Sequence, residues 1–361
     1  MQDNDPADYL SRHWQTGSNE IPGRVDELIA LCAADSDNAP LYRDMLLDVI
    51  RMAQADRNRW DAKIMLHTIR EMEQAFSRME IFKRRRKVTV FGSARTPIDH
   101  PLYALARAMG EELAANDYMA ITGAGGGIMT ATHEGAGLDH SLGFNITLPF
   151  EQRSNNIVHG TSHDLSFGFF FLRKLFFVKE ADALILCPGG FGTLDEALEV
   201  LTLVQTGKSP MVPIILLDQP DGQYWQAFLQ FVRSQLIDNH YIKPDDINLL
   251  TPCSSPAQAM QVVLDFYSNY HSSRRVDDQY MLRLNRPLTA QALAQLDDRF
   301  GHICKSGGFV QQAVCDQESD EPELGELTRL CFDFNERDQG GLRTLIDFVN
   351  QPENYQSPGT A

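Results

Sequence analysis

One segment of the sequence combines a glycine-rich turn with a carboxylate, which are groups suited to binding a phosphate and acting on a bond near it. It reads Pro-Gly-Gly-Phe-Gly-Thr-Leu-Asp-Glu over residues 188–196 and follows an apolar run. Gly189, Gly190 and Gly192 allow backbone conformations that other residues avoid. A helix beginning at Thr193 would point its free N–H groups at this turn, where a phosphate fits. The segment lacks the Lys-Ser/Thr pair of a P-loop, so triphosphate and magnesium chemistry is not indicated.

The carboxylate at the end of this segment, Glu196, has two interpretations. Thr193-x-x-Glu196 matches a capping box, in which the glutamate only accepts a hydrogen bond from the Thr193 amide. A carboxylate in this place could instead take part in chemistry on a bound ligand. The glycines upstream favour the second interpretation, because a helix cap requires no glycine loop.

Two cations, Arg173 and Lys174, are embedded in a strongly apolar helical segment at residues 169–177. A half-buried guanidinium needs an anionic partner to offset its desolvation. That partner could be a structural carboxylate, Glu196, or the phosphate of a ligand. The sequence alone does not distinguish among these three possible partners.

Two other loops could approach the same ligand. A Gly-Ser turn follows an apolar run at residues 88–91, and the loop Gly-Ala-Gly-Gly-Gly-Ile-Met occupies residues 123–129. The second loop either binds an anion through its amides or provides tight strand-to-helix packing. It is not a dinucleotide fingerprint, which would need glycine at Ile128, so a nicotinamide cofactor is disfavoured. The candidate ligand-binding residues of the two loops are Gly92, Ser93, Gly125, Gly126, Gly127 and Met129.

Short apolar runs alternate with helical segments after residue 87, which is typical of a parallel sheet with crossover helices. The predicted strands are residues 88–91, 118–122, 143–148, 183–187 and 212–217. The predicted helices are residues 101–115, 128–137, 169–179, 193–206 and 224–236. The pattern predicts an α/β protein with a Rossmann-like doubly wound domain over residues 87–270. Ligands of such sheets bind beyond the carboxyl ends of the strands, where the loops described above lie.

Two extensions flank this domain. Residues 1–86 are predicted to be helical, with an apolar stripe at Met65, Ile69, Met72, Phe76 and Met79 that packs on the neighbouring domain or forms a seam between subunits. The five consecutive cations at residues 83–87 are interpreted as a solvated face beside a strand or a contact to an acidic neighbour.

The polar stretch His-Ser-Ser-Arg-Arg-Val-Asp-Asp-Gln after residue 270 predicts a boundary, followed by a small α+β domain at residues 271–361. Its predicted order is strand, helix, strand, strand, helix. The predicted strands are residues 281–284, 309–314 and 330–334, and the predicted helices are residues 289–303 and 341–349.

Composition excludes several classes of function. The 361 residues include 49 acidic and 32 basic side chains, and the formal net charge of −17 disfavours a general nucleic-acid or anionic-membrane binder. No leader-like N-terminus or membrane-spanning run is recognisable, so a cytoplasmic location is expected. The six cysteines include no C-x-x-C pair, and neither a zinc site nor a disulfide framework is indicated.

Taken together, the 188–196 segment and the Arg173-Lys174 pair resemble the PGGxGTxxE signature and its Arg-Lys partner in the Lonely Guy (LOG) family. These are cytokinin riboside 5′-monophosphate phosphoribohydrolases, often mislabelled lysine decarboxylases. The resemblance extends over about residues 87–250 and includes the Gly-Ser turn, residues 145–152 and Asn155. Ala124 departs from the family's glycine loop.

The resemblance implies hydrolysis of the N-glycosidic bond of a purine nucleoside 5′-monophosphate, either AMP-like or a cytokinin, without a cofactor or metal. It implies Arg173 and Glu196 as the catalytic pair, with Glu196 kept ionised by Arg173 and the helix dipole. It also implies a homodimer or higher homo-oligomer. The implied nucleotide-binding residues are Asn155, Lys174, Gly189, Gly190, Gly192, Thr193 and Thr202.

A second hypothesis is a nucleotide sensor that holds a mononucleotide in the same pocket without cleaving it, while the terminal segments transmit occupancy. The presence of both Arg173 and Glu196 favours catalysis. A lysine decarboxylase is disfavoured, because the sequence offers no convincing context for a pyridoxal-phosphate lysine.

Overall fold

The computed structural model of this chain describes residues 20–56, 58–147, 153–276, 278–314, 318 and 321–356. The chain divides into two compact units, residues 1–70 and 71–361. The described part of the first unit is helical, as predicted, with α2 (Glu20–Cys32), α3 (Ala39–Gln54) and the beginning of α4 (Arg59–Glu80). None of the described helices is both long and apolar enough to cross a bilayer.

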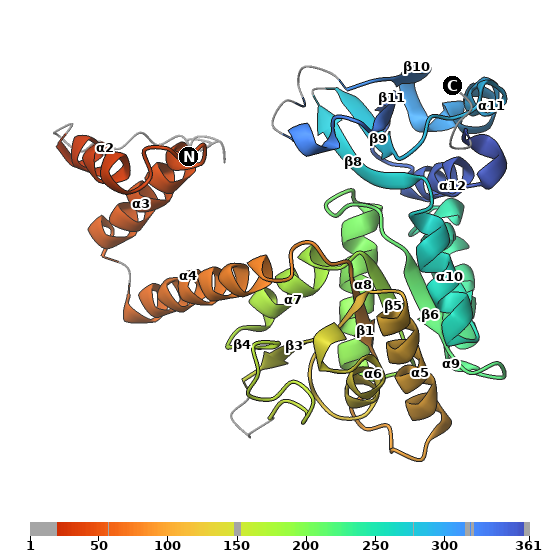
Figure 1. Cartoon of the computed structure of the whole chain (residues 1–361), viewed down its shortest axis with the longest axis horizontal. Coiled ribbons are helices and arrows are strands. Elements are labelled where there is room, and N and C mark those ends of the chain that lie inside the picture. Colours follow the sequence, from red (N-terminus) through yellow and green to blue (C-terminus); the bar gives the residue numbers. More distant parts are fainter. Residues whose placement is uncertain are drawn as a thin grey trace. The chain divides into compact units, whose positions relative to one another are not determined.

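The second unit contains a seven-stranded, all-parallel sheet, which confirms the predicted α/β class (Figure 1). The strand order is β4-β3-β2-β1-β5-β6-β7. Because the order reverses between β1 and β5, the loops after these two strands leave on opposite sides and open a crevice between them. The strands are β1 (Lys87–Phe91), β2 (Met119–Thr122), β3 (Ser141–Ile146), β4 (Asp164–Phe167), β5 (Ala183–Leu186), β6 (Ile214–Leu217) and β7 (Leu250–Cys253).

Alternating side chains of the central strands face two helical layers. Val88 and Val90 belong to a core shared with α5 (Pro101–Ala115), α6 (Ile128–Ala136) and α10 (Pro256–Phe266). Phe91 belongs to the opposite core, which includes the end of α4. The other helices of that layer are α7 (Phe170–Lys179), α8 (Phe191–Gln205) and α9 (Tyr224–Phe231).

A second sheet of four antiparallel strands follows, in the order β10-β11-β9-β8, with helices α11 and α12 (Figure 1). Its apolar side chains, including Leu282 and Phe332, belong to the same core cluster as Phe176 of α7. The elements are β8 (Tyr270–Val276), β9 (Gln279–Leu284), α11 (Ala290–Phe300), β10 (Cys304–Gln312), β11 (Thr328–Phe334) and α12 (Gln339–Val349). The predicted domain boundaries at residues 86 and 270 stay predictions.

Some predicted elements were wrong or missing. The polar stretch after residue 270 is strand β8 rather than a boundary loop, and it forms an edge of its sheet, where polar side chains such as Arg274 are tolerated. Strands β4 and β7, which have only four residues each, and helix α10 were not predicted. The predicted helix at residues 224–236 ends as α9 at Phe231 and continues as π-helical turns. Residue 148 of the predicted third strand lies outside the described residues.

The apolar stripe of α4 is buried only toward its end. Met79 is 4% exposed, and the ring of Phe76 lies 5.1 Å from that of Phe176 on α7. Met65 and Ile69, in the first unit, are 41% and 49% exposed. The prediction that the stripe packs on the neighbouring domain therefore holds for its C-terminal half.

Candidate active site

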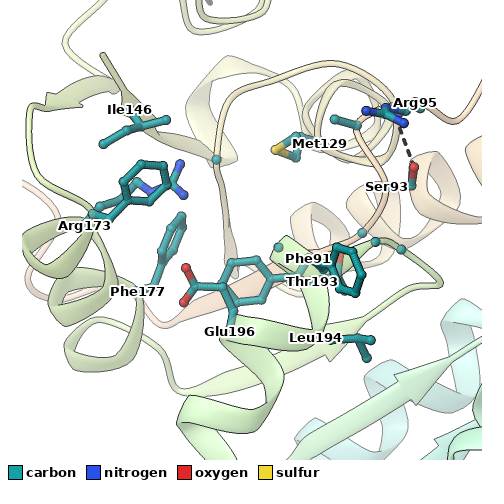
Figure 2. Close-up of a pocket in the computed structure, with 18 of the residues that line it drawn as sticks. Phe91, Ser93, Arg95, Met129, Ile146, Arg173, Phe177, Thr193, Leu194 and Glu196 are labelled. Atoms are coloured by element: carbon teal, nitrogen blue, oxygen red, sulfur yellow. Dashed lines mark hydrogen bonds between the residues drawn. The ribbon is translucent and has the colours of Figure 1, made fainter. Parts of the chain in front are cut away.

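A cavity of about 850 Å³ opens at the carboxyl ends of β1 and β5, where the strand order reverses (Figure 2). Its volume is in the range of small-molecule sites. The lining comes from the loops after both strands, the beginning of the loop after β2, and the first turns of α7 and α8. Nine predicted site residues line it: Gly92, Ser93, Met129, Arg173, Gly189, Gly190, Gly192, Thr193 and Glu196.

The glycine turn after β5 leads directly into α8, which begins at Phe191 with Gly190 as its N-cap and without a side-chain cap. The prediction that the helix begins at Thr193 was therefore wrong by two residues, and Thr193 and Glu196 do not form a capping box. The Thr193 and Leu194 amides donate to the Gly190 carbonyl at 3.1 Å and 3.2 Å, which leaves the Phe191 and Gly192 amides to face an anionic ligand. The Tyr224 hydroxyl donates a hydrogen bond of 2.7 Å to the Gly189 carbonyl and holds the turn.

The loop after β1 is fixed by its neighbours on both sides. The Ser93 amide donates to the Pro188 carbonyl at 3.2 Å, and the Ser93 carbonyl accepts from the Ile128 amide at 3.1 Å. Gly127 has a φ of +59°, and a methyl group there would overlap the Ser93 carbonyl oxygen. Close packing therefore explains the glycine at residue 127. Gly125, Gly126 and Gly127 are absent from the cavity lining, and their role in binding stays a prediction.

Asn155 supports the glycine loop from behind. Its backbone amide donates to the Ala124 carbonyl at 2.7 Å, and its side chain lies 3.1 Å from Nδ1 of His133. Burial lowers the pKa of His133 to about 4, so the imidazole is neutral at pH 7. Its other nitrogen lies 3.1 Å from Oγ1 of Thr122 at the end of β2. Asn155 is absent from the cavity lining, and its role in binding nucleotide stays a prediction.

Arg173 and Glu196 reach the same cavity from adjacent helices, α7 and α8. Figure 2 shows both side chains directed into the cavity, with Phe177 between them. The Arg173 guanidinium carbon lies 5.1 Å and 5.4 Å from the ring centres of Phe170 and Phe177. A methyl group on Gly123 would lie 3.7 Å from Nη1 of Arg173, which places the guanidinium against the loop after β2.

Neither of these charged groups is satisfied by the protein. Glu196 is 4% exposed, and its Oε2 and the Arg173 Nε are buried atoms without a hydrogen-bond partner. The two side chains do not form an ion pair with each other. Buried polar atoms without partners are rare in proteins and call for an explanation, such as a ligand.

Burial raises the pKa of Glu196 to about 7, although the nearby cations Lys174 and Arg173 oppose this effect. The prediction that Arg173 and the helix dipole keep the carboxylate ionised at pH 7 was therefore wrong, because desolvation outweighs both. At neutral pH Glu196 is present in both protonation states, so it can accept or donate a proton. Burial also lowers the pKa of Arg173.

Two predicted binding residues point elsewhere. Nζ of Lys174 lies 2.7 Å from Oδ2 of Asp195 and 2.6 Å from Oε2 of Glu199, so it ties α7 to α8 outside the cavity lining. Thr202 is exposed and donates to the Leu198 carbonyl at 2.7 Å within its own helix. Their proposed roles in binding stay predictions.

The apolar part of the cavity lining was not predicted, although the run of phenylalanines at residues 169–177 indicated an apolar surface near Arg173. Phe191 is 92% exposed beside the cavity, in contrast to the buried Phe177. The missed lining residues are Phe91, Ala94, Arg95, Gly123, Ile146, Phe170, Phe177, Phe191, Leu194 and Tyr224. Flat apolar side chains beside a charged pair suit a ligand with an aromatic base and an anionic group.

Within the described ranges, no group of three or more His, Cys, Asp and Glu side chains is arranged to hold a metal ion. Cys32, Cys187, Cys253 and Cys304 are free thiols.

Comparisons with known proteins agree with the geometry. A family model described as possible lysine decarboxylase matches residues 126–263. The chain is 35% identical over 99 residues to a probable cytokinin riboside 5′-monophosphate phosphoribohydrolase of Oryza sativa subsp. japonica, over 27% of this chain and 44% of that protein. It is 42% identical over 72 residues to a cytokinin riboside 5′-monophosphate phosphoribohydrolase of Arabidopsis thaliana, over 20% of this chain and 31% of that protein.

These matches confirm, for this part of the chain, the predicted resemblance to the Lonely Guy family. The chain thus spans less than half the length of these two relatives. Among solved structures, the molybdenum cofactor binding protein from Rippkaea orientalis is similar at 20% identity with a TM-score of 0.37, over 50% of this chain and 96% of that one.

Proposed function

We propose that this protein hydrolyses the N-glycosidic bond of a purine nucleoside 5′-monophosphate, releasing the free base and ribose 5-phosphate. The observation that carries the proposal is the buried pair of Arg173 and Glu196, unsatisfied by the protein and facing one cavity beside the free amides of α8. The relatives named as cytokinin riboside 5′-monophosphate phosphoribohydrolases support the same reaction.

The amides at the beginning of α8 would bind the 5′-phosphate, since a helix N-terminus favours an anion. Gly190 and Gly192 beside them leave the backbone accessible. The phosphate is remote from the reacting carbon, so its binding energy can be used to hold the ribose in place for the reaction.

Glu196 would act at the ribose. Cleavage of the bond between C1′ and the base passes through an oxocarbenium-like state, which a carboxylate stabilises. A water oxygen bonds to C1′ while the bond to the base nitrogen breaks. One water proton leaves with the base, and a carboxyl with a pKa of about 7 can relay it. Arg173 would contact the departing base or the ribose hydroxyls.

We also propose a homodimer formed through the outer face of α7. Phe171 and Leu175 lie one helical turn apart there and are 53% and 43% exposed. Large apolar side chains that share an exposed face often mark a contact with a second protein. Analytical ultracentrifugation tests this: a Phe171→Ser and Leu175→Ser double variant should be monomeric, whereas a monomeric unmodified chain would contradict the proposal.

Purified protein incubated with AMP tests the reaction. We expect equal amounts of adenine and ribose 5-phosphate by chromatography, and much slower release from adenosine, which lacks the phosphate. Cytokinin riboside, guanosine, cytidine and uridine monophosphates then define the base preference. Binding of AMP by calorimetry without release of adenine would contradict the proposal and support the mononucleotide sensor instead.

A further inference from the structure

A second cavity, of about 390 Å³, lies at the opposite end of β1 from the candidate active site. Lys87, the first residue of β1, lines this cavity, whereas Phe91, the last, lines the other. Five residues of strand separate the two by roughly 15 Å. A ligand in one cavity therefore does not touch a ligand in the other.

The second cavity is strongly positive in an otherwise acidic protein. Its lining includes the complete basic run of the sequence, which the proposed function does not use. The cations are Lys83, Arg84, Arg85, Arg86, Lys87 and Lys179, and the carboxylates are Glu80, Glu180 and Asp182. Six cations and three carboxylates line the cavity, and Asp117 outside the lining pairs with Arg85. The surplus is two positive charges, whereas the whole chain has a net charge of −17.

Part of this cluster has a structural role. Nζ of Lys87 lies 3.3 Å from Oε2 of Glu180, and both side chains are buried. Nζ of Lys179 lies 2.6 Å from the other oxygen of Glu180. Arg86 lies 3.4 Å from Asp182. The predicted contact to an acidic neighbour is thus present, and it holds the beginning of β1.

Arg85 also has a structural role, because its Nη2 lies 3.0 Å from Oδ1 of Asp117 and its Nη1 donates to the Asp139 carbonyl at 2.6 Å. The two remaining cations are Lys83 and Arg84. Arg84 is exposed and forms no ion pair within the described part of the chain. Nζ of Lys83 lies 3.2 Å from Oε1 of Glu80, and both side chains are about 70% exposed, so this pair contributes little stability. Neighbouring like charges repel each other, and a bound anion would relieve that repulsion.

We propose that this cavity binds a small polyanion that carries two or more phosphate groups. Its volume suits a small molecule. Arginine and lysine are the side chains that recognise phosphate, through charge-assisted hydrogen bonds. A long nucleic acid is disfavoured, because the net negative charge of the protein repels an extended polyanion.

Calorimetric titration of the full chain with inorganic tripolyphosphate tests the proposal. We expect saturable binding that weakens as salt is added. A Lys83→Gln and Arg84→Gln double variant should bind roughly threefold to thirtyfold more weakly, since each exposed cation contributes up to about 1 kcal/mol. Both side chains are exposed, so the fold should be unchanged, which a thermal melt checks.

The matched control is a Lys305→Gln and Arg337→Gln double variant, which removes the same charge from β10 and from the loop between β11 and α12. It should bind tripolyphosphate like the unmodified chain. Equal weakening in both double variants would show a general effect of net charge and overturn the site. If Arg173→Ala loses binding and the Lys83 and Arg84 double variant does not, the anion binds in the candidate active site. That result would also overturn the proposed second site. Absence of saturable binding at tripolyphosphate concentrations up to about 1 mM would also overturn the proposed second site.

Discussion

At the scale of single residues, Glu196 lowers the stability of the protein. A buried carboxyl with an unpartnered oxygen loses its hydration without regaining a full set of hydrogen bonds. A glutamine or an apolar side chain would avoid that loss. The placement of Glu196 is therefore better explained by chemistry in the cavity than by folding.

We expect Glu196→Gln to keep the fold and to bind AMP within a few fold of the unmodified chain, because the two side chains have nearly the same shape. Release of adenine should fall by roughly 10² to 10⁴, the usual range for loss of an acid–base group. Chromatographic assays and calorimetry measure the two effects separately. A fully active Glu196→Gln protein would refute the catalytic role.

The raised pKa of Glu196 makes a second prediction, about stability and pH. Its pKa of about 7 in the folded protein lies above the ordinary glutamate pKa of 4.5, so the folded state binds more protons between these two pH values. The stability of the unmodified chain should therefore fall, relative to Glu196→Gln, as the pH rises from 5 to 8. The difference should change by about 2–3 kcal/mol. Urea unfolding of both proteins at the two pH values measures it, and a constant difference would contradict the raised pKa.

Arg173→Ala should reduce release of adenine by at least about 100-fold, in line with the removal of one electrostatic contact to a reacting group. The variant should remain folded, because Arg173 does not form an ion pair with Glu196. Since Arg173 lowers the pKa of Glu196, its removal should raise that pKa further. Circular dichroism and a pH–rate profile test these outcomes. An unfolded variant would indicate a structural role instead.

At the scale of elements, α6 and its two flanking glycines show how one helix positions a loop of the cavity. Gly127 and Gly137 stand at its two ends, with φ values of +59° and +73°. A methyl group on Gly127 would overlap the Ser93 carbonyl, whereas a methyl group on Gly137 would have no atom within 4 Å. The atoms around the backbone therefore exclude a larger side chain at Gly127 but not at Gly137.

Gly137→Ala should therefore lower the free energy of unfolding by about 1–3 kcal/mol, the cost of holding alanine at a positive φ with a ψ of 167°, a region that glycine alone adopts readily. Gly127→Ala has the same cost and must also displace Ser93, so it should be more destabilising and should raise KM for AMP. Thermal melts and steady-state kinetics compare the two. Equal stability and equal KM in the two variants would show that Gly127 does not position the Ser93 loop.

At the scale of the whole molecule, the second sheet is held by a buried ionic cluster. Glu318 accepts hydrogen bonds from Nε of Arg283 at 2.8 Å and from Nε of Arg329 at 2.6 Å, and all three side chains are almost fully buried. Burial alone would raise the pKa of Glu318, but the hydrogen bonds from Arg329 and Arg283 outweigh it and lower the pKa.

Glu318→Gln should cost about 3–5 kcal/mol of stability at pH 7, because it removes the counter-ion of the buried Arg329 and leaves Arg283 paired with Glu321 alone. The exposed Glu323→Gln is the matched control and should change stability by less than about 0.5 kcal/mol. Because the pKa of Glu318 is lowered, its contribution is present above the unfolded pKa and is lost on acidification through the folded pKa. Urea unfolding across acidic pH tests this, and equal stability of the two variants would contradict it.

Much of the fold was readable from local patterns in the sequence. The apolar runs at β1, β5 and β6 and the helical periods between them identified the parallel sheet, because both patterns repeat over a few residues. Strand β8 was not readable: its side chains are polar, and only its pairing with β9 defines it as a strand. Strands β4 and β7 were not readable either, because four residues are too few to establish a pattern.

The sequence by itself determined the α/β class, the glycine turn of residues 188–196 and the two charged residues to consider. Only the tertiary structure decided that Arg173 and Glu196 reach one cavity, that Gly127 packs against the Ser93 carbonyl, and that burial raises the pKa of Glu196 to about 7. Desolvation and contact depend on every atom that surrounds a group. Those atoms come from strands and helices far apart in the chain, which a local pattern does not encode.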